Sequence, residues 1–185
     1  MNGGIISKRY AKALLSFARS KEASKEVYSS MNKLADSFFQ LPALRDALGN
    51  PLISKKEKQS LIENAMGSNV NDVLKRFIDL VLFQKREKHL QCIALMYMDL
   101  YRKENNIYLG HLTTATAIND SDKKKMQSMM TKLITNGSLE FKTSINPKLL
   151  GGFILNIDSR ELDASIATQL QRVKDQFMEQ NRKSI

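Results

Sequence analysis

The stretch from Pro147 to Asp158 reads Pro-Lys-Leu-Leu-Gly-Gly-Phe-Ile-Leu-Asn-Ile-Asp, and it decides how the C-terminal part of the chain folds. The glycine pair at 151–152 interrupts whatever precedes it, because only glycine takes positive φ angles without strain. The apolar run at 153–157 is typical of a short, well-buried strand. Asp-Ser-Arg at 158–160 is turn chemistry. The stretch therefore predicts a loop, a glycine turn, a buried strand and a hairpin turn, in that order.

A helix is predicted directly after this hairpin. Asp163 is placed to cap it by accepting a hydrogen bond from the backbone N–H of Ser165 or Ile166. Apolar residues then recur at helical spacing at 166, 170, 173 and 177. We expect a structural role, setting the turn and the cap, for five residues: Gly151, Gly152, Asp163, Ser165 and Ile166.

Composition excludes several classes of protein. Among 185 residues there is one cysteine, Cys92, so neither a disulfide framework within the chain nor a multi-cysteine metal site is expected. His89 and His111 have no carboxylate or cysteine at metal-binding spacing, and neither a glycine-rich phosphate loop nor a nucleophile elbow occurs. No apolar run approaches the roughly 20 residues that cross a bilayer. We therefore predict no enzyme activity, no cofactor and no direct membrane insertion.

The first 105 residues have the periodicity of helices. Apolar stripes at 3–4-residue spacing predict six helices, at 5–20, 24–39, 42–48, 54–66, 70–83 and 88–104. Ser54 and Glu57 form a capping-box pattern at the start of the fourth. The Gly-Asn-Pro sequence at 49–51 ends the third, because proline cannot continue a helix.

The pattern changes near residue 105. Residues 107–117 are rich in β-branched side chains and predict a strand, 121–135 predict a helix, and 139–145 alternate apolar and polar residues as a half-buried strand does. The predicted fold class is mostly α. A six-helix bundle at 1–105 is followed by a small α+β domain at 106–185.

Four motifs, taken in order, resemble one known family. The ordered C-terminal set described above is one. The others are Arg-Tyr-Ala-Lys-Ala-Leu at 9–14, Asn-Pro at 50–51 followed by Lys55 and Lys58, and Thr-Ala-Thr-Ala at 114–117. Together they are similar to the delta subunit of bacterial F-type ATP synthase, called the oligomycin-sensitivity-conferring protein in mitochondria. One departure is Gln-Lys-Arg at 84–86, where the family usually carries Asn-x-Arg.

The resemblance implies a connector without catalytic activity. In that family the helical domain, here 1–105, binds the N-terminal segment of an α subunit of the catalytic head. The C-terminal domain, here 106–185, grips the b subunits of the peripheral stalk, so the head does not turn with the rotor. The implied location is the cytoplasmic face of the bacterial inner membrane, where the chain is peripheral and held through the complex.

The apolar arcs of the helices at 5–20 and 70–83 are wider than one core contact needs, which favours a groove for a partner helix. The alternative is that both helices are simply central in the bundle. The residues predicted to form the groove are Tyr10, Ala11, Leu14, Leu15, Ala18, Phe77, Ile78, Val81, Leu82 and Arg86.

The formal charge of +10 raises a second hypothesis, a basic helical RNA-binding module. The basic residues are scattered, however, and no aromatic–basic platform is present. RNA binding would also weaken steeply with added salt. We therefore predict no nucleic-acid partner and keep RNA binding as the alternative.

Overall fold

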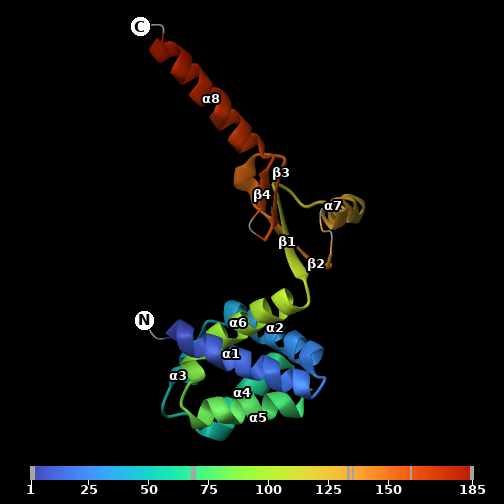
Figure 1. Cartoon of the computed structure of the whole chain (residues 1–185). Helices are drawn as coiled ribbons and strands as arrows, with labels where there is room; N and C mark the ends of the chain where they lie inside the picture. Colours follow the sequence, from blue (N-terminus) through green and yellow to red (C-terminus); the bar gives the residue numbers. More distant parts are fainter. Residues whose placement is uncertain (1–2, 68–69, 133, 135, 159, 184–185) are drawn as a thin grey trace. The chain divides into compact units, whose positions relative to one another are not determined.

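The computed structural model describes residues 3–67, 70–132, 134, 136–158 and 160–183. The chain divides into two compact units, an N-terminal unit (Met1–Glu104) and a C-terminal unit (Asn105–Ile185) (Figure 1). A bundle of helices followed by a small sheet with helices confirms the predicted fold class.

The N-terminal unit is built around its last helix. Helix α6 packs against both α1 and α2, α2 packs against α4, and α4 packs against α5. The Tyr97 side chain of α6 is fully buried, and its hydroxyl donates a hydrogen bond to the Ser24 carbonyl oxygen at 3.2 Å. Within the described residues the helices are α1 (Gly3–Ser20), α2 (Ser24–Gln40), α3 (Ala43–Gly49), α4 (Lys55–Met66), α5 (Asp72–Phe83), the 3-10 turn η1 (Glu87–His89) and α6 (Leu90–Glu104).

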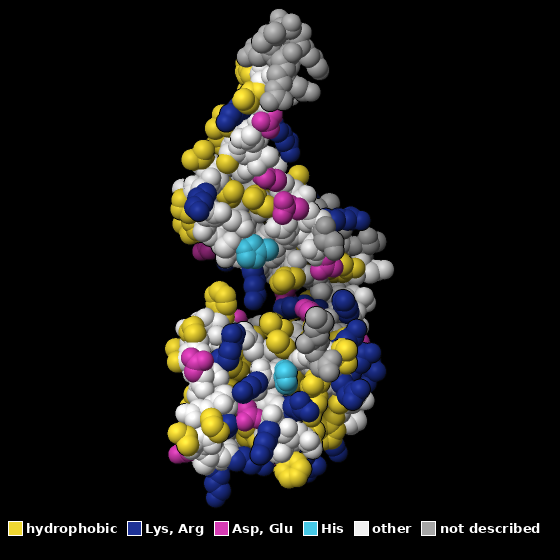
Figure 2. All heavy atoms as spheres, turned by 90° about the vertical axis from the view of Figure 1, so that its left-hand side faces the viewer, with side chains coloured by type: hydrophobic (Ala, Val, Ile, Leu, Met, Phe, Trp, Pro, Cys, Tyr) yellow, Lys and Arg dark blue, Asp and Glu magenta, His cyan; other side chains and the backbone are white. Residues whose placement is uncertain are grey.

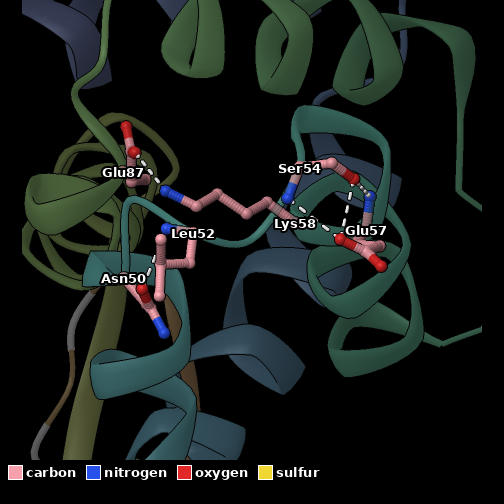
Figure 3. Close-up of polar contacts among 6 residues, drawn as sticks. All are labelled: Asn50, Leu52, Ser54, Glu57, Lys58 and Glu87. Carbon is pink, nitrogen blue, oxygen red and sulfur yellow. Dashed lines mark hydrogen bonds and ion pairs between the residues drawn. The ribbon is translucent and has the colours of Figure 1, made fainter.

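Two helices of this unit begin at side-chain caps. The predicted capping box at α4 is formed: the Glu57 backbone N–H donates to Ser54 Oγ at 3.3 Å, and the Ser54 N–H donates to Glu57 Oε2 at 2.9 Å (Figure 3). Asn71 caps α5 by accepting a hydrogen bond from the Val73 N–H at 3.0 Å. This cap explains why α5 begins at Asp72 rather than at the expected residue 70.

A buried ion pair joins α4 to η1 (Figure 3). Lys58 Nζ lies 2.7 Å from Glu87 Oε1, and the two side chains are only 8% and 13% exposed. Glu87 Oε2 is also buried and receives no hydrogen bond from the described residues. Burial alone would raise the pKa of the Glu87 carboxyl, but the hydrogen bond and charge of Lys58, a backbone hydrogen bond and the charge of Lys88 together lower that pKa.

Replacing Lys58 with methionine should therefore destabilise the chain by about 3 kcal/mol at pH 7, because a buried carboxylate is left without its cation. In the wild type, the lowered pKa of Glu87 stabilises the fold above the unfolded pKa of about 4.3, and this stabilisation is lost as the pH falls. Without Lys58 the pKa of Glu87 rises, so the cost should shrink toward pH 4. Urea denaturation of the full chain between pH 4 and pH 7 measures both effects.

Two control variants accompany this measurement. Lys55→Met breaks the ion pair with Asp79 (3.3 Å), in which both side chains are about half exposed, and should cost less than about 0.5 kcal/mol. The double variant Lys58→Met with Glu87→Gln should recover most of the lost stability, since no charge then remains buried. A Lys58 variant as stable as the wild type at pH 7 would contradict this account of the pair.

The C-terminal unit is a four-stranded sheet of order β2-β1-β3-β4. Strands β1 and β2 are parallel and α7 is the crossover between them, whereas β3 is antiparallel to both β1 and β4. Leu112, Met130 and Leu155 form the core between the sheet and α7. The elements are β1 (Ile107–Thr114), α7 (Asp120–Lys132), β2 (Ser138–Ile145), the 3-10 turn η2 (Pro147–Leu149), β3 (Phe153–Ile157), β4 (Arg160–Asp163) and α8 (Ile166–Lys183).

The clearest differences from the expected elements of this unit concern strands β1 and β4. Strand β1 ends at Thr114, whose hydroxyl donates to the Thr116 carbonyl oxygen at 2.7 Å and turns the chain before the predicted end at 117. Helix α7 spans Asp120–Lys132, and its expected end at residue 135 lies outside the described residues. Strand β4 was expected only as part of a hairpin turn, because Arg160–Asp163 has three charged residues among its four. Its pairing with β3, not an apolar pattern, makes it a strand.

The glycine turn before β3 is closed by backbone contacts. Leu150 and Gly152 have φ angles of 62° and 72°, in the left-handed region. The Ile166 N–H donates to the Gly151 carbonyl oxygen at 3.1 Å, so the turn also holds the start of α8. A Cβ atom at Gly152 would lie 2.2 Å from the Ala164 carbonyl oxygen, which leaves no room for a side chain.

The cap of α8 corrects one expectation. The predicted hydrogen bond from the Ser165 N–H to Asp163 is formed, but Asp163 is the last residue of β4 and not the N-cap. The residue before the helix is Ser165, which is fully buried. Ser165 Oγ accepts a hydrogen bond from the Thr168 N–H at 3.3 Å. Asp163 supports this cap by accepting from the Ser165 N–H at 2.8 Å and from the Thr168 hydroxyl at 2.7 Å. These hydrogen bonds hold the pKa of Asp163 below its ordinary value.

We expect Ser165→Ala to lower the stability of the C-terminal unit by about 1 kcal/mol, because an N-cap side chain is lost. The control is Ser138→Ala at the exposed first residue of β2, which should change stability by less than about 0.5 kcal/mol. Chemical denaturation followed by circular dichroism compares the two variants. Equal midpoints would show that Ser165 is not the cap.

Candidate partner-binding surfaces

A groove of about 660 Å³ runs between α1 and α5. Its apolar wall on α1 follows helical spacing at 10, 13, 14 and 17, and Phe77 and Leu80 face it from α5. The rings of Tyr10 and Phe77 meet edge to face, with centroids 6.4 Å apart and planes at 71°. The lining residues are Arg9, Tyr10, Ala13, Leu14, Phe17, Arg76, Phe77 and Leu80.

Three of the residues predicted for this groove line it: Tyr10, Leu14 and Phe77. Leu14 and Phe77 are buried and form its floor, Tyr10 is half-buried, and Leu80 remains 48% exposed. The groove therefore presents apolar side chains that are reachable from solvent but anchored in the bundle. This is the form that binds an amphipathic helix through a few inserted side chains.

The expected outward position of the two small residues of α1 is wrong. Ala11 and Ala18 have no exposed surface, and α1 packs mainly against α6 of the same chain. Their small side chains permit close approach by a helix of the same chain, not by a partner. On α5, Leu82 is likewise buried, together with Ile78 and Val81.

Two further predicted residues lie away from the groove. Leu15 lines a separate depression of about 440 Å³ beside Leu100 of α6. Arg86 is exposed in the turn after α5 and is not among the lining residues. Sequence reasoning missed Ala13, Phe17, Leu80 and the two arginines as groove residues. For Ala13 and Phe17 a signal was available in the sequence, namely the i, i+3, i+4, i+7 spacing that starts at Tyr10.

A second apolar surface lies on α8. This helix extends away from the sheet of its own unit (Figure 1), and hydrophobic side chains lie along the left edge of the upper projection in Figure 2, below its grey tip. The exposed fractions of Ile166, Leu170, Val173 and Phe177 lie between 44% and 64%. Their spacing of four, three and four residues makes one narrow stripe, which we call the α8 stripe, and it matches a coiled-coil seam.

The described ranges contain neither a membrane-spanning helix nor a cluster of metal ligands. No helix there is long and apolar enough to cross a membrane. No group of three or more His, Cys, Asp or Glu residues in that part of the chain is placed to hold a metal ion.

Comparison with known proteins decides the family. The sequence profile described as "ATP synthase delta (OSCP) subunit" matches residues 6–177. The chain belongs to this family. The ATP synthase subunit delta of Phocaeicola vulgatus is 46% identical over 98% of both chains, and that of Bacteroides thetaiotaomicron is 41% identical over the full length of both.

A solved structure of the family's complex has the same fold. A chain of the Toxoplasma gondii mitochondrial ATP synthase hexamer superposes with a TM-score of 0.71, covering 93% of this chain and 97% of its own length, at 19% identity. Membership of the delta (OSCP) family makes the chain a peripheral-stalk component of ATP synthase that associates with other subunits of that complex. None of these relatives supports the alternative of an RNA-binding module.

Proposed function

We propose that the chain is the non-catalytic link between the catalytic head and the b subunits of the peripheral stalk. The observation that carries the proposal is that each of the two units has an open apolar surface with helical spacing, the α1–α5 groove on the first and the α8 stripe on the second. A connector needs two independent binding surfaces. In this proposal the chain performs no chemical step and resists the torque of the rotor by holding both partners.

The partner proposed for the groove is the N-terminal segment of an α subunit, bound as a helix. A single helix in a groove buries less than the standard interface of about 800 Å² per partner, so its affinity has to come from a few buried anchors. Tyr10, Phe77 and Leu80 provide aromatic and aliphatic surface around the space that such anchors would fill.

The partner proposed for the α8 stripe is the C-terminal part of the b subunits. Apolar residues spaced alternately four and three apart occupy the a and d positions of a coiled-coil heptad. A helix with such a seam can pack lengthwise along another helix, because each of these side chains fits between four side chains of the facing helix. The side chains of the stripe are 44% to 64% exposed, and the start of α8 is held by contacts with η2 and by the hydrogen bond from the Ile166 N–H to the Gly151 carbonyl oxygen. Through these partners the chain would be held at the cytoplasmic face of the inner membrane.

Calorimetric titration tests the first half of the proposal. The full chain is titrated with a synthetic peptide that corresponds to the N-terminal segment of the α subunit from the same organism. We expect one peptide per chain and a negative heat-capacity change, which marks burial of apolar surface. Absence of binding at high micromolar peptide would refute the groove as the site for the α subunit.

A further inference from the structure

The apolar groove is flanked by two arginines, one on each wall, and neither has a carboxylate partner among the residues that the structure describes. Arg9 extends from α1 and Arg76 from α5, and both are exposed residues among those that line the groove. In the described ranges, neither guanidinium forms an ion pair with a carboxylate. The acids nearest to Arg76 in sequence, Asp72 and Asp79, lie 3.9 Å from Lys75 and 3.3 Å from Lys55.

A docked helix would change the surroundings of both arginines. It would cover the groove and remove water from the guanidinium groups, and a charge that loses water is costly unless it gains a partner. A guanidinium presents a planar set of donors that matches a carboxylate with two parallel hydrogen bonds. A helix with carboxylates beside its apolar stripe would therefore bind, and a helix with neutral or basic edges would be penalised.

We propose that Arg9 and Arg76 determine which helices the groove accepts. The occupant is an amphipathic helix with one carboxylate on each side of its apolar stripe, one beside Arg9 and the other beside Arg76. This inference rests on the proposed function and takes the N-terminal segment of the α subunit as that helix. The apolar wall supplies affinity, and the two arginines supply selectivity and orientation. The α-subunit segment must then carry acidic residues on both edges of its apolar face.

The test is a set of calorimetric titrations with the full chain and the α-subunit peptide. We expect Arg9→Gln and Arg76→Gln each to raise the Kd for the peptide by about tenfold at low salt, because each substitution removes a charge-assisted hydrogen bond. With a peptide in which the edge carboxylates are replaced by amides, the same substitutions should have little effect. The affinity of the wild-type chain should also fall with added salt more steeply than that of the double variant Arg9→Gln with Arg76→Gln.

The matched control is Arg45→Gln on α3, which removes the same charge from an exposed position that does not line the groove. The Kd of this variant for the peptide should stay within about twofold of the wild-type value, since a distant surface charge is screened by salt. Circular dichroism of each variant checks that the bundle is intact.

The outcomes separate this inference from the proposed function. If the wild-type chain binds the peptide, but the arginine variants bind equally well at every salt concentration, charge selection is wrong and the groove remains the site. If the arginine variants and Arg45→Gln weaken binding to the same extent, the effect is general charge attraction and the inference is again overturned. If the wild-type chain does not bind, both proposals fail.

Discussion

Replacing Gly152 with valine is expected to unfold the C-terminal unit and to leave the N-terminal unit folded. The residue has a φ of 72°, which a β-branched side chain adopts only under strain, and its new Cβ would lie 2.2 Å from the Ala164 carbonyl oxygen. Backbone strain and overpacking together should cost about 4 kcal/mol. Backbone atoms form the obstacle, so no side-chain movement relieves it.

Limited proteolysis of the full chain measures this result. The variant should yield a resistant fragment that ends near Glu104, the last residue of the N-terminal unit. The control is Gly4→Val, where a Cβ meets nothing within 4 Å, and it should be digested like the wild type. Uniform degradation of the Gly152→Val chain would contradict two independently stable units. A digestion pattern like that of the wild type would contradict the steric account of the turn.

The second large effect concerns binding. Leu80→Gln should weaken binding of the α-subunit segment by about 3 kcal/mol, roughly a hundredfold in Kd, because an apolar anchor is lost and an amide is buried without a partner. Stability should change little, since Leu80 is 48% exposed in the free chain.

A closely matched control exists on α6. Leu95 is 47% exposed and does not line the groove, so Leu95→Gln makes the same chemical change at the same exposure. Calorimetric titration should give this variant the wild-type Kd. Equal losses of affinity at the two positions would show that the α1–α5 groove is not the specific contact.

The sequence predicts the helical elements well because their apolar stripes are long and regular. The six helices of the N-terminal unit were expected within a few residues of their observed bounds, and the capping box at Ser54 is formed. Prediction from the sequence fails where hydrogen bonding to a neighbouring strand, rather than burial of apolar side chains, defines an element. Strand β4 is charged at three of its four positions, and only its hydrogen bonds to β3 identify it.

The candidate site was predictable only in part. Periodicity identifies an apolar arc on α1, but it does not tell which part of the arc another helix of the chain covers. Ala11 and Ala18 are fully buried away from the groove, whereas Tyr10 and Leu14 line it. Arg9 and Arg76 have no distinguishing pattern, because a charge at the edge of an apolar stripe has the same sequence signal as a solvated helix face. Their absence from every ion pair within the described ranges is visible only in three dimensions.

The most direct test of the connector is whether one chain holds both partners at once. Purified catalytic head, the soluble part of the b subunits and the full chain are mixed and separated by size. We predict that the b subunits elute with the head only when the chain is present. The Leu80→Gln chain should no longer bind the head but should still bind the b subunits. The Val173→Asp chain, which carries a charge in the α8 stripe, should no longer bind the b subunits but should still bind the head. Co-elution of the b subunits with the head in the absence of the chain, or loss of both partners in either variant, would contradict the account.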